Sequence, residues 1–274
     1  MPELPEVETV RRALIPKLIN KKILSVRILY NGIIEAPTPA MFRERIKNQT
    51  FRNITRRGKW LIFELDDYYL LSHLRMEGKF FFKPKSAETS KHEHVIFELE
   101  DTTFRYDDTR KFGKMLLIKK DDINSAPPFA KLGLEPFDEG FDTYYLLDKL
   151  RGKHIPIKTS LLDQSIVAGI GNIYANEILF LSKINPLTKA GALNIKDIDN
   201  IILNSKKVLE EAISLGGSTI HSYSSVDGVD GKFQNCLKVH GRENEKCPVC
   251  SGKICKIVVG GRGTYYCPNC QKEK

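Results

Sequence analysis

The stretch CPVCSGKICKIVVGGRGTYYCPNC, residues 247–270, contains two Cys-x-x-Cys pairs on either side of a short run of strand-forming residues. Sixteen residues separate the two pairs, a spacing typical of four-thiolate zinc sites. The hairpin between them is too small to fold stably without a metal. Disulfides are the alternative, which the expected cytosolic setting disfavours. The pattern predicts one structural Zn²⁺ with no open coordination position, bound by Cys247, Cys250, Cys267 and Cys270.

The residues around this stretch are strongly basic. Of the formal net charge of +9, +6 lies in residues 231–274, which favours an anionic partner without identifying it. The 274-residue chain is 41% hydrophobic and 28% charged, so it can form two folded domains. It has no secretory signal and no apolar run of about 18 residues, so we expect a cytoplasmic protein that does not bind membranes.

The chain before the basic module changes character along its length. Val7, Val10 and Leu14 predict one amphipathic helix near the N-terminus. From residue 23 to 119, aromatic and β-branched runs broken by turn residues predict a strand meander or sandwich; they include ILSVRILY, KWLIFELD, YYLLSHLRM, KFFFKP, HVIFELED, TTFRYDD and GKMLLIKK. A Pro- and Gly-rich connection at 127–140 precedes helical segments, including DIDNIILNSKKVLEEAISLGG at 197–217. The fold class is therefore α+β.

Two glycine-containing segments of the second half could contact phosphates. In LLDQSIVAGIGNIYANEILFLSKI, residues 161–184, Asn172 follows Gly171 and would cap a helix that begins at Ile173. A helix start with nearby glycines is a common phosphate site, although an ordinary pair of antiparallel helices explains the same pattern. Arg262 lies between two glycines at the expected hairpin tip, where it could approach a phosphate or simply be a solvated turn residue.

Two stretches of the strand-rich half place apolar residues among charges. They are RMEG at 75–78 and RKFG at 110–113. Proteins that kink DNA insert apolar side chains between base steps, and Met76, Arg110 and Phe112 could do so. The alternative is that Met76 and Phe112 belong to the core of the domain.

The N-terminal segment MPELPEVETV raises a chemical possibility. Pro5 suits the first turn of a helix, but Pro2 has no such explanation. Removal of Met1 would expose a secondary amine with a pKa near 8, partly neutral at pH 7 and therefore nucleophilic. Attack on a sugar C1′ would give an iminium ion that cannot relax to a neutral imine, which makes the next carbon acidic. Glu3 could then move protons to and from the sugar.

Eight motifs in chain order resemble one known family. They are PELPEVETVRR, RRGKWLIFEL, SHLRMEGK, TRKFGKM, KLGLEPF, AGIGNIYANE, GGSTIHSY and GGRGTYYCPNCQ. Together they span residues 2–271 and resemble bacterial formamidopyrimidine-DNA glycosylase. The resemblance implies a bifunctional DNA glycosylase/AP lyase of base-excision repair. Such an enzyme removes oxidised purines, 8-oxoguanine and formamidopyrimidines, and then nicks the strand by β,δ-elimination.

The resemblance also implies residue roles and domains. Pro2 would be the Schiff-base nucleophile, Glu3 the general acid/base and Lys59 a catalytic lysine, with Glu6 in the lesion pocket. Met76, Arg110 and Phe112 would fill the space left by the flipped nucleotide, whereas phosphates would be held by His73, Lys158, Asn172 and Arg262. The implied domains are a catalytic helix and β-sandwich at 1–130, a linker at 131–150, a helix-two-turn-helix domain at 151–230 with a lesion-capping loop near 216–232, and a zinc finger at 231–274.

The partner implied is damaged double-stranded DNA, bound by a monomer in the cytoplasm at the nucleoid. His221 and His240 depart from the family pattern around the expected capping loop, so the lesion range is less defined than the reaction. Thr159 is a further departure, which we interpret as local. Two alternatives are an endonuclease VIII-like glycosylase for oxidised pyrimidines and a non-catalytic DNA-binding protein that uses only the zinc module.

Overall fold

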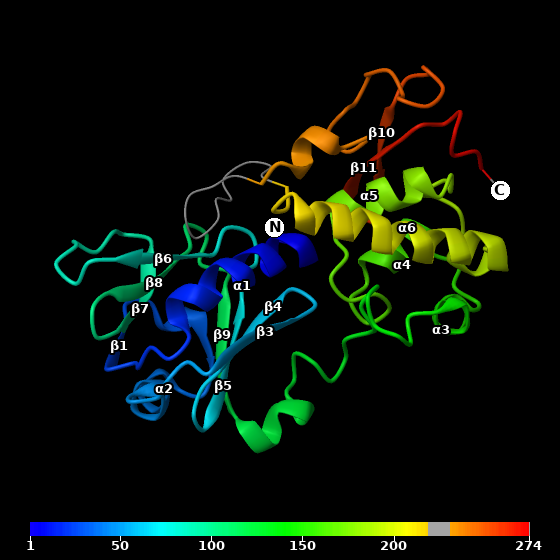
Figure 1. Ribbon diagram of the computed structural model, residues 1–274. Helices are drawn as coiled ribbons and strands as arrows, with labels where there is room; N and C mark the ends of the chain where they lie inside the picture. Colours follow the sequence, from blue (N-terminus) through cyan, green and yellow to red (C-terminus); the bar gives the residue numbers. More distant parts are fainter. Residues whose placement is uncertain (219–230, 274) are drawn as a thin grey trace. The chain divides into compact units, whose positions relative to one another are not determined.

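The computed structural model describes residues 1–218 and 231–273, so most of the expected capping loop, including His221, lies outside the described residues. The chain forms two compact units (Figure 1). Unit 1 comprises Met1–Ala130 and Gly216–Gly231, and unit 2 comprises Lys131–Leu215 and Lys232–Lys274.

Unit 1 begins with helix α1, Leu4–Leu18. Pro5 stands in its first turn, where no backbone N–H is needed. The apolar side chains predicted for one helical face are buried, and the side chain of Arg11 donates to the carbonyl of Ile54 (3.2 Å) in strand β3. The expected N-terminal helix is therefore confirmed, and tertiary contacts fix it to a sheet.

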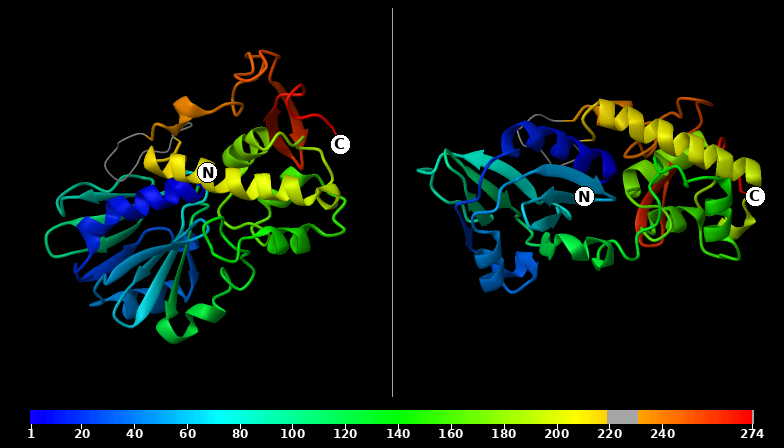
Figure 2. Two further views of the ribbon diagram at one scale, coloured as in Figure 1. Left: turned by 45° about the vertical axis from the view of Figure 1, so that its right-hand side comes forward. Right: turned by 60° about the horizontal axis from the view of Figure 1, so that its bottom comes forward.

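Unit 1 also contains two sheets (Figures 1 and 2). The four-stranded sheet has the order β1-β7-β8-β6, and the five-stranded sheet the order β2-β9-β5-β4-β3. The aromatic rings of Phe63, Phe80 and Phe104 pack against one another between them, with Phe63 and Phe80 centroids 5.8 Å apart. The strands are β1 (Ser25–Ile28), β2 (Ile34–Ala36), β3 (Asn53–Arg57), β4 (Trp60–Glu64), β5 (Tyr68–His73), β6 (Lys79–Lys83), β7 (Glu93–Glu98), β8 (Thr103–Asp107) and β9 (Lys114–Lys119).

Each predicted strand run contains a strand, but other elements of unit 1 were not predicted. The additional elements are β2, β3, helix α2 (Pro39–Ile46) and the 3₁₀ turns η1 (Asn31–Ile33) and η2 (Lys120–Ser125). Strand β3 reads NITRR, and its charged residues concealed its strand character. It is stabilised by antiparallel pairing with β4 rather than by its own composition.

Unit 2 is helical and ends in a hairpin. Its elements are α3 (Thr143–Leu150), α4 (Ile157–Leu162), α5 (Asn172–Leu181), η3 (Ala190–Ala192), α6 (Ile195–Ser214), η4 (Phe233–Cys236), β10 (Cys255–Val259) and β11 (Arg262–Tyr266). Helix α6 begins at a capping box formed by Asn194 and Asp197. Residues 131–150, expected to be a linker, contain α3, whose Leu146 and Leu150 are buried.

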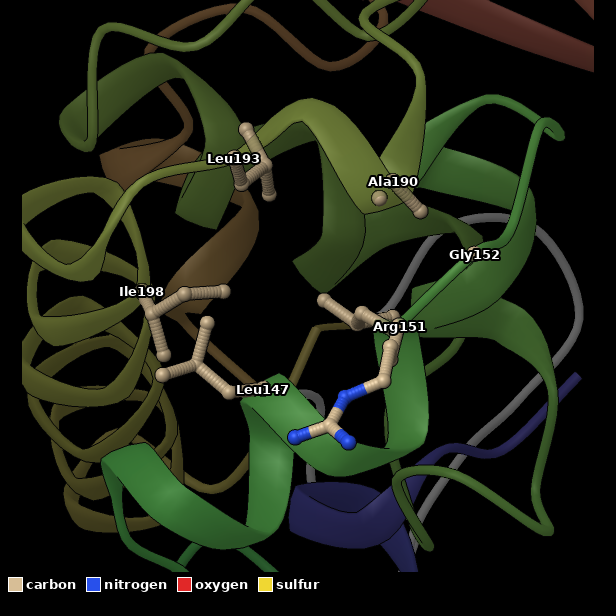
Figure 3. A pocket seen from close by; sticks show the side chains of 8 residues that line it. Leu147, Arg151, Gly152, Ala190, Leu193 and Ile198 are labelled. Carbon is tan, nitrogen blue, oxygen red and sulfur yellow. The ribbon is translucent and has the colours of Figure 1, made fainter.

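Unit 2 also contains a small apolar pocket of about 200 Å³ between α3, η3 and α6 (Figure 3). Leu147, Leu193 and Ile198 line it, and the Arg151 side chain lies at its edge. None of the predicted site residues borders this pocket. Among the helices that the structure describes, none combines the length and the apolar character needed to cross a bilayer.

Candidate active site and nucleic-acid interface

The start of α1 places several predicted site residues in buried positions. Pro2 is buried, and Glu3 is the N-cap residue with only 3% of its surface exposed. The backbone N–H of Glu3 donates to Oε2 of Glu6 (2.8 Å), and the N–H of Ser218 donates to Oε1 of the same carboxylate (2.8 Å). Glu6 therefore connects the helix start to the chain segment at 216–218.

Gly217 allows this close approach. Its φ is +78°, and an added Cβ would lie 2.8 Å from Oε1 of Glu6. Both the backbone conformation and the available space therefore require glycine at this position.

Charged groups of unit 1 converge on the N-terminus. Burial lowers the pKa of the Met1 amine; Glu3 and Glu6 oppose this shift, whereas Lys59 and Arg110 add to it. In the structure Met1 precedes Pro2, so the Pro2 nitrogen belongs to a peptide bond. Burial at this site thus favours a neutral amine, whereas the nearby carboxylates favour the charged form.

Lys59 lies at the turn between β3 and β4 and is 5% exposed. Gly58 precedes it with φ +58°, and its carbonyl accepts a hydrogen bond from Arg56 (3.0 Å). Arg56 forms an ion pair with Glu8 of α1 (3.5 Å). Helix α1 therefore helps to fix the turn that carries Lys59.

His73 ends strand β5, directly opposite Trp60 in the register with β4. Its Nδ1 accepts a hydrogen bond from the N–H of Arg75 (3.0 Å), so the proton of the neutral ring resides on Nε2. Burial, Arg75 and Lys59 together lower the pKa of His73 to about 3. His73 is therefore a neutral donor at physiological pH.

Sheet topology brings Met76, Arg110 and Phe112 to the same end of the sandwich. His73 of β5 pairs with Lys114 of β9 in one sheet, and Lys79 of β6 pairs with Asp107 of β8 in the other. The 74–78 and 108–113 loops both connect these sheets, so they lie side by side. Phe112 remains 49% exposed, with the Arg110 guanidinium 4.8 Å from its ring centre. An exposed Phe does not belong to the core, which favours the wedge interpretation.

In unit 2, three predicted phosphate ligands meet at the hairpin. Lys158 is fully buried and donates to the carbonyl of Gly263 (3.1 Å) and to Oγ1 of Thr264 (2.6 Å). Asn172 donates to the same Gly263 carbonyl (3.1 Å). These bonds hold the strand that begins at Arg262, whose side chain is exposed.

Two local expectations about this region were wrong. Asn172 is the first residue of α5, and the N-cap position belongs to Gly171. The hairpin turn consists of Gly260 and Gly261, which have positive φ angles of +55° and +73°, so Arg262 already lies in β11. A two-residue turn with positive φ at both positions matches the twist of the strands, so the two glycines form the tip of the hairpin.

The four cysteines predicted to bind zinc lie together. Their sulfur atoms all lie within 4.8 Å of one another, with Cys247 and Cys270 Sγ atoms 3.8 Å apart and those of Cys250 and Cys267 3.4 Å apart. These separations exceed the roughly 2.05 Å of a disulfide and suit a tetrahedron of Zn–S bonds of about 2.3 Å. The residues present therefore fit one structural zinc ion.

Sequence reasoning missed three buried residues of these regions. Glu177 of α5 accepts backbone hydrogen bonds from Lys238, Val239 and His240 at 2.8–3.0 Å. Tyr106, near the end of β8, and Asp108, at the start of the loop that carries Arg110, are fully buried. The only sequence signal was the Asp-Asp pair at 107–108, which is typical of a turn.

The sandwich, the helical unit and the four-cysteine hairpin correspond to three domain models that together describe a helix-two-turn-helix DNA glycosylase. The formamidopyrimidine-DNA glycosylase N-terminal domain model matches residues 1–115, and the corresponding H2TH domain model matches residues 132–224. A model of the zinc finger found in FPG and IleRS matches residues 244–272. The chain belongs to the formamidopyrimidine-DNA glycosylase family.

Curated relatives are similar over nearly the whole chain. The formamidopyrimidine-DNA glycosylase of Exiguobacterium sibiricum is 49% identical over 274 residues, covering 99% of both chains. That of Bacillus subtilis is 46% identical over 276 residues, covering all of both chains. Identity at this level over the full length supports a common fold and chemistry.

Solved structures give the same result. Lactococcus lactis Fpg in complex with DNA containing an abasic site has a TM-score of 0.93 at 42% identity, covering 98% of this chain and 99% of that chain. MutM in complex with DNA containing carbocyclic 8-oxo-G also has a TM-score of 0.93 at 42% identity, with 99% and 100% covered. Wild-type Lactococcus lactis FPG in complex with DNA containing an oxidised pyrimidine has a TM-score of 0.92 at 41% identity, with 99% and 100% covered.

Proposed function

We propose that this protein is a bifunctional DNA glycosylase and AP lyase that removes oxidised purines from duplex DNA and then cuts the strand. The carrying observation is the burial of the start of α1, which lowers the pKa of the N-terminal amine beside Glu3, with a further lowering by Lys59 and Arg110. That environment favours a neutral amine beside a carboxylate, which a nucleophile and its proton carrier require.

Removal of Met1 would turn the Pro2 nitrogen into the nucleophile. Its lone pair forms a bond to C1′ while the bond from C1′ to the base breaks. Glu3 donates and accepts protons as the sugar ring opens. The resulting iminium ion withdraws electrons, so a C2′ proton can leave and the 3′-phosphate is eliminated; δ-elimination then releases the 5′-phosphate. Lys59, beside this centre, would contact the lesion or its phosphate.

The other predicted residues would hold the DNA. Chemistry on a base inside a duplex requires the nucleotide to be flipped out, and Met76, Arg110 and Phe112 would fill the vacated space. His73, Asn172 and Arg262 would contact phosphates. Lys158 would act through the hairpin strand, because its ammonium group is buried against Gly263 and Thr264. The structural zinc would maintain that hairpin.

The domain roles belong to the same proposal. Residues 1–130 would carry the catalytic chemistry, residues 151–230 the helix-two-turn-helix DNA contacts and residues 231–274 the zinc finger. Glu6 would border the lesion pocket while holding residue 218. We place the enzyme, as a monomer, on the nucleoid in the bacterial cytoplasm.

The decisive experiment is borohydride trapping. Mass spectrometry first establishes the fraction of purified protein that lacks Met1. That material, incubated with an 8-oxoguanine duplex and borohydride, should form a covalent adduct, and peptide mapping should place it on Pro2. An undamaged duplex and the Pro2→Gly variant are the controls. Adduct formation at another residue, or full activity with Met1 retained, would contradict the mechanism.

A second candidate is action on oxidised pyrimidines. It is favoured by the relative from Lactococcus lactis that was solved with DNA containing an oxidised pyrimidine. Parallel cleavage of 8-oxoguanine and thymine glycol duplexes separates the two candidates. We expect faster cleavage of the 8-oxoguanine duplex.

A further inference from the structure

The hydroxyl of Tyr106 lies between the ends of the 74–78 and 108–113 loops. A Cβ added to Gly78 would lie 2.2 Å from Tyr106 Oη, and one added to Gly113 would lie 1.6 Å from the same atom. Real side chains never approach so closely, so both positions accept only glycine while Tyr106 is present. The phenol oxygen therefore touches the backbone of both loops at once.

Asp108 holds one of these loops through its backbone. Its Oδ1 accepts the N–H of Arg110 (3.0 Å), and its Oδ2 accepts the N–H of Gly113 (2.8 Å). The Tyr106 hydroxyl is 3.4 Å from Oδ2. Asp108 is fully buried, so these donors provide the hydrogen bonds that its oxygens would otherwise lose.

Other contacts leave the 108–113 loop little freedom. Nε2 of His94 lies 2.8 Å from the carbonyl oxygen of Asp108. The ammonium group of Lys111, which has a φ of +58°, lies 4.7 Å from the ring centre of Tyr30. These two contacts restrain the backbone at Asp108 and the side chain of Lys111, whereas the Phe112 side chain remains exposed.

We propose that Tyr106, supported by Asp108, is a positioning residue that couples the two loops, so that Met76 and Phe112 enter the DNA duplex as one unit. This inference rests on the proposed function, because it assumes that these side chains replace a flipped nucleotide. Tyr106 touches no substrate. It sets the spacing between two loops that arise from different sheet connections.

A simple packing role would not require the hydroxyl. The ring centres of Tyr106 and Phe80 lie 5.2 Å apart, and this contact needs only a phenyl ring at position 106. Burial and the neighbouring Asp108 raise the pKa of the phenol, so it stays protonated and can donate to the carboxylate. Tyr106→Phe therefore isolates the coupling function, since it keeps the ring and removes only the oxygen between the glycines.

The test is a mutant cycle on nucleotide flipping. Stopped-flow fluorescence of 2-aminopurine placed next to an 8-oxoguanine reports the opening rate for Met76→Ala, Phe112→Ala and the double variant, each with Tyr106 or Phe at position 106. With Tyr106 we expect the two substitutions to be strongly non-additive. In the Tyr106→Phe background we expect additivity, and an opening rate reduced on the order of tenfold, the size of a coupling between contacting residues.

Controls separate the possible failures. Tyr69→Phe, on β5 and away from both loops, should leave the opening rate and the non-additivity unchanged. Unfolding midpoints show whether each variant is folded at the assay temperature, and Asp108→Asn offers a second way to loosen the loop if Tyr106→Phe is unstable.

Unchanged non-additivity in folded Tyr106→Phe and Asp108→Asn variants would overturn the inference, even if the opening rate fell. If the wild-type protein neither opens the lesion pair nor forms the borohydride adduct, the proposed function itself is wrong. The two failures are therefore distinguishable.

Discussion

At the scale of single residues, Glu3 and Glu6 are both buried at the start of α1 and bond to each other's backbone in a capping box. Glu6 accepts backbone hydrogen bonds on both carboxylate oxygens, from Glu3 and from Ser218. A carboxylate so engaged holds the backbone of the helix start and of residue 218. The Glu3 side chain also accepts a backbone N–H, that of Glu6, in the capping box. Because Glu3 is buried next to Pro2, we propose that it carries out the proton transfer.

We expect Glu3→Gln to lower the rate of base removal by about 10²–10⁴-fold, because an amide cannot exchange protons with the sugar. Single-turnover cleavage of an 8-oxoguanine duplex measures this rate. Glu100→Gln, at an exposed turn of the sandwich, is the matched control and should retain wild-type activity. Wild-type excision by Glu3→Gln would rule out the acid/base assignment.

His73 predicts a pH dependence of stability. Its pKa in the folded state is about 3, below the ordinary value of 6.5, so the unfolded chain binds a proton that the folded protein excludes. The contribution of His73 to the free energy of unfolding is therefore complete above pH 6.5 and is lost as pH falls toward 3, at about 1.4 kcal/mol per pH unit.

Denaturant unfolding of wild type and His73→Gln at several pH values between 4 and 7.5 tests this prediction, since glutamine does not titrate. The difference in the free energy of unfolding between the two proteins should shrink as the pH falls. A difference that is constant over this range would show that His73 is not buried in its neutral form.

At the scale of secondary-structure elements, side chains of α4 and α5 organise the chain around the zinc hairpin. Lys158 and Asn172 both donate to Gly263 of β11, and Glu177 accepts from three consecutive backbone N–H groups at 238–240. Two short helices thus fix a segment that contains little regular structure of its own. Precise placement of Arg262 depends on these contacts.

We expect Glu177→Gln to destabilise the protein by about 2 kcal/mol, because the side-chain NH₂ group would face backbone donors and leave buried N–H groups unsatisfied. The midpoint of chemical unfolding measures the loss. Glu210→Gln, on the exposed face of α6, should change stability by less than about 0.5 kcal/mol. Equal stability of the two variants would contradict the role assigned to Glu177.

At the scale of the whole molecule, the core of the sandwich and the cluster around the zinc cysteines differ greatly in size. Unit 1 contains a large aromatic sandwich core, whereas the cluster around the zinc cysteines contains few apolar residues, chiefly Phe180, Val239 and Ile254. So small a core cannot hold a hairpin without the metal. DNA binding should therefore depend on zinc even though zinc takes no part in the chemistry.

We expect Cys247→Ser to lose zinc and to weaken binding to a lesion duplex about 10³-fold, down to the non-specific level. Metal analysis and fluorescence anisotropy at fixed salt concentration measure the two effects. Cys236→Ser, outside the four-sulfur cluster, is the control and should keep both zinc and affinity. Tight, specific binding by a zinc-free Cys247→Ser protein would show that the hairpin is dispensable.

Much of the fold followed from local pattern. The cysteine spacing predicted the zinc site, alternating aromatic runs predicted the strands of the sandwich, and helical periodicity predicted α1 and α6. Strand β3 and helix α2 were not predicted, because their charged or mixed sequences form regular structure only through contacts with neighbouring elements. The roles of Pro2 and Glu3 followed from the chemistry of a secondary amine beside a carboxylate, and that of Lys59 from motif resemblance. All three remain predictions.

By itself the sequence determined the zinc ligands, the strand-rich first half and the family, because each depends on the order and spacing of residue types along the chain. Only the tertiary structure decided that Lys158 is buried against the hairpin, that Glu6 is bonded to Ser218 and that Tyr106 separates Gly78 from Gly113. The sequence separation is 106 residues for Lys158 and Thr264, 212 for Glu6 and Ser218, and 28 for Tyr106 and Gly78. Local sequence preferences carry no information about such distances, which are fixed only when the chain packs.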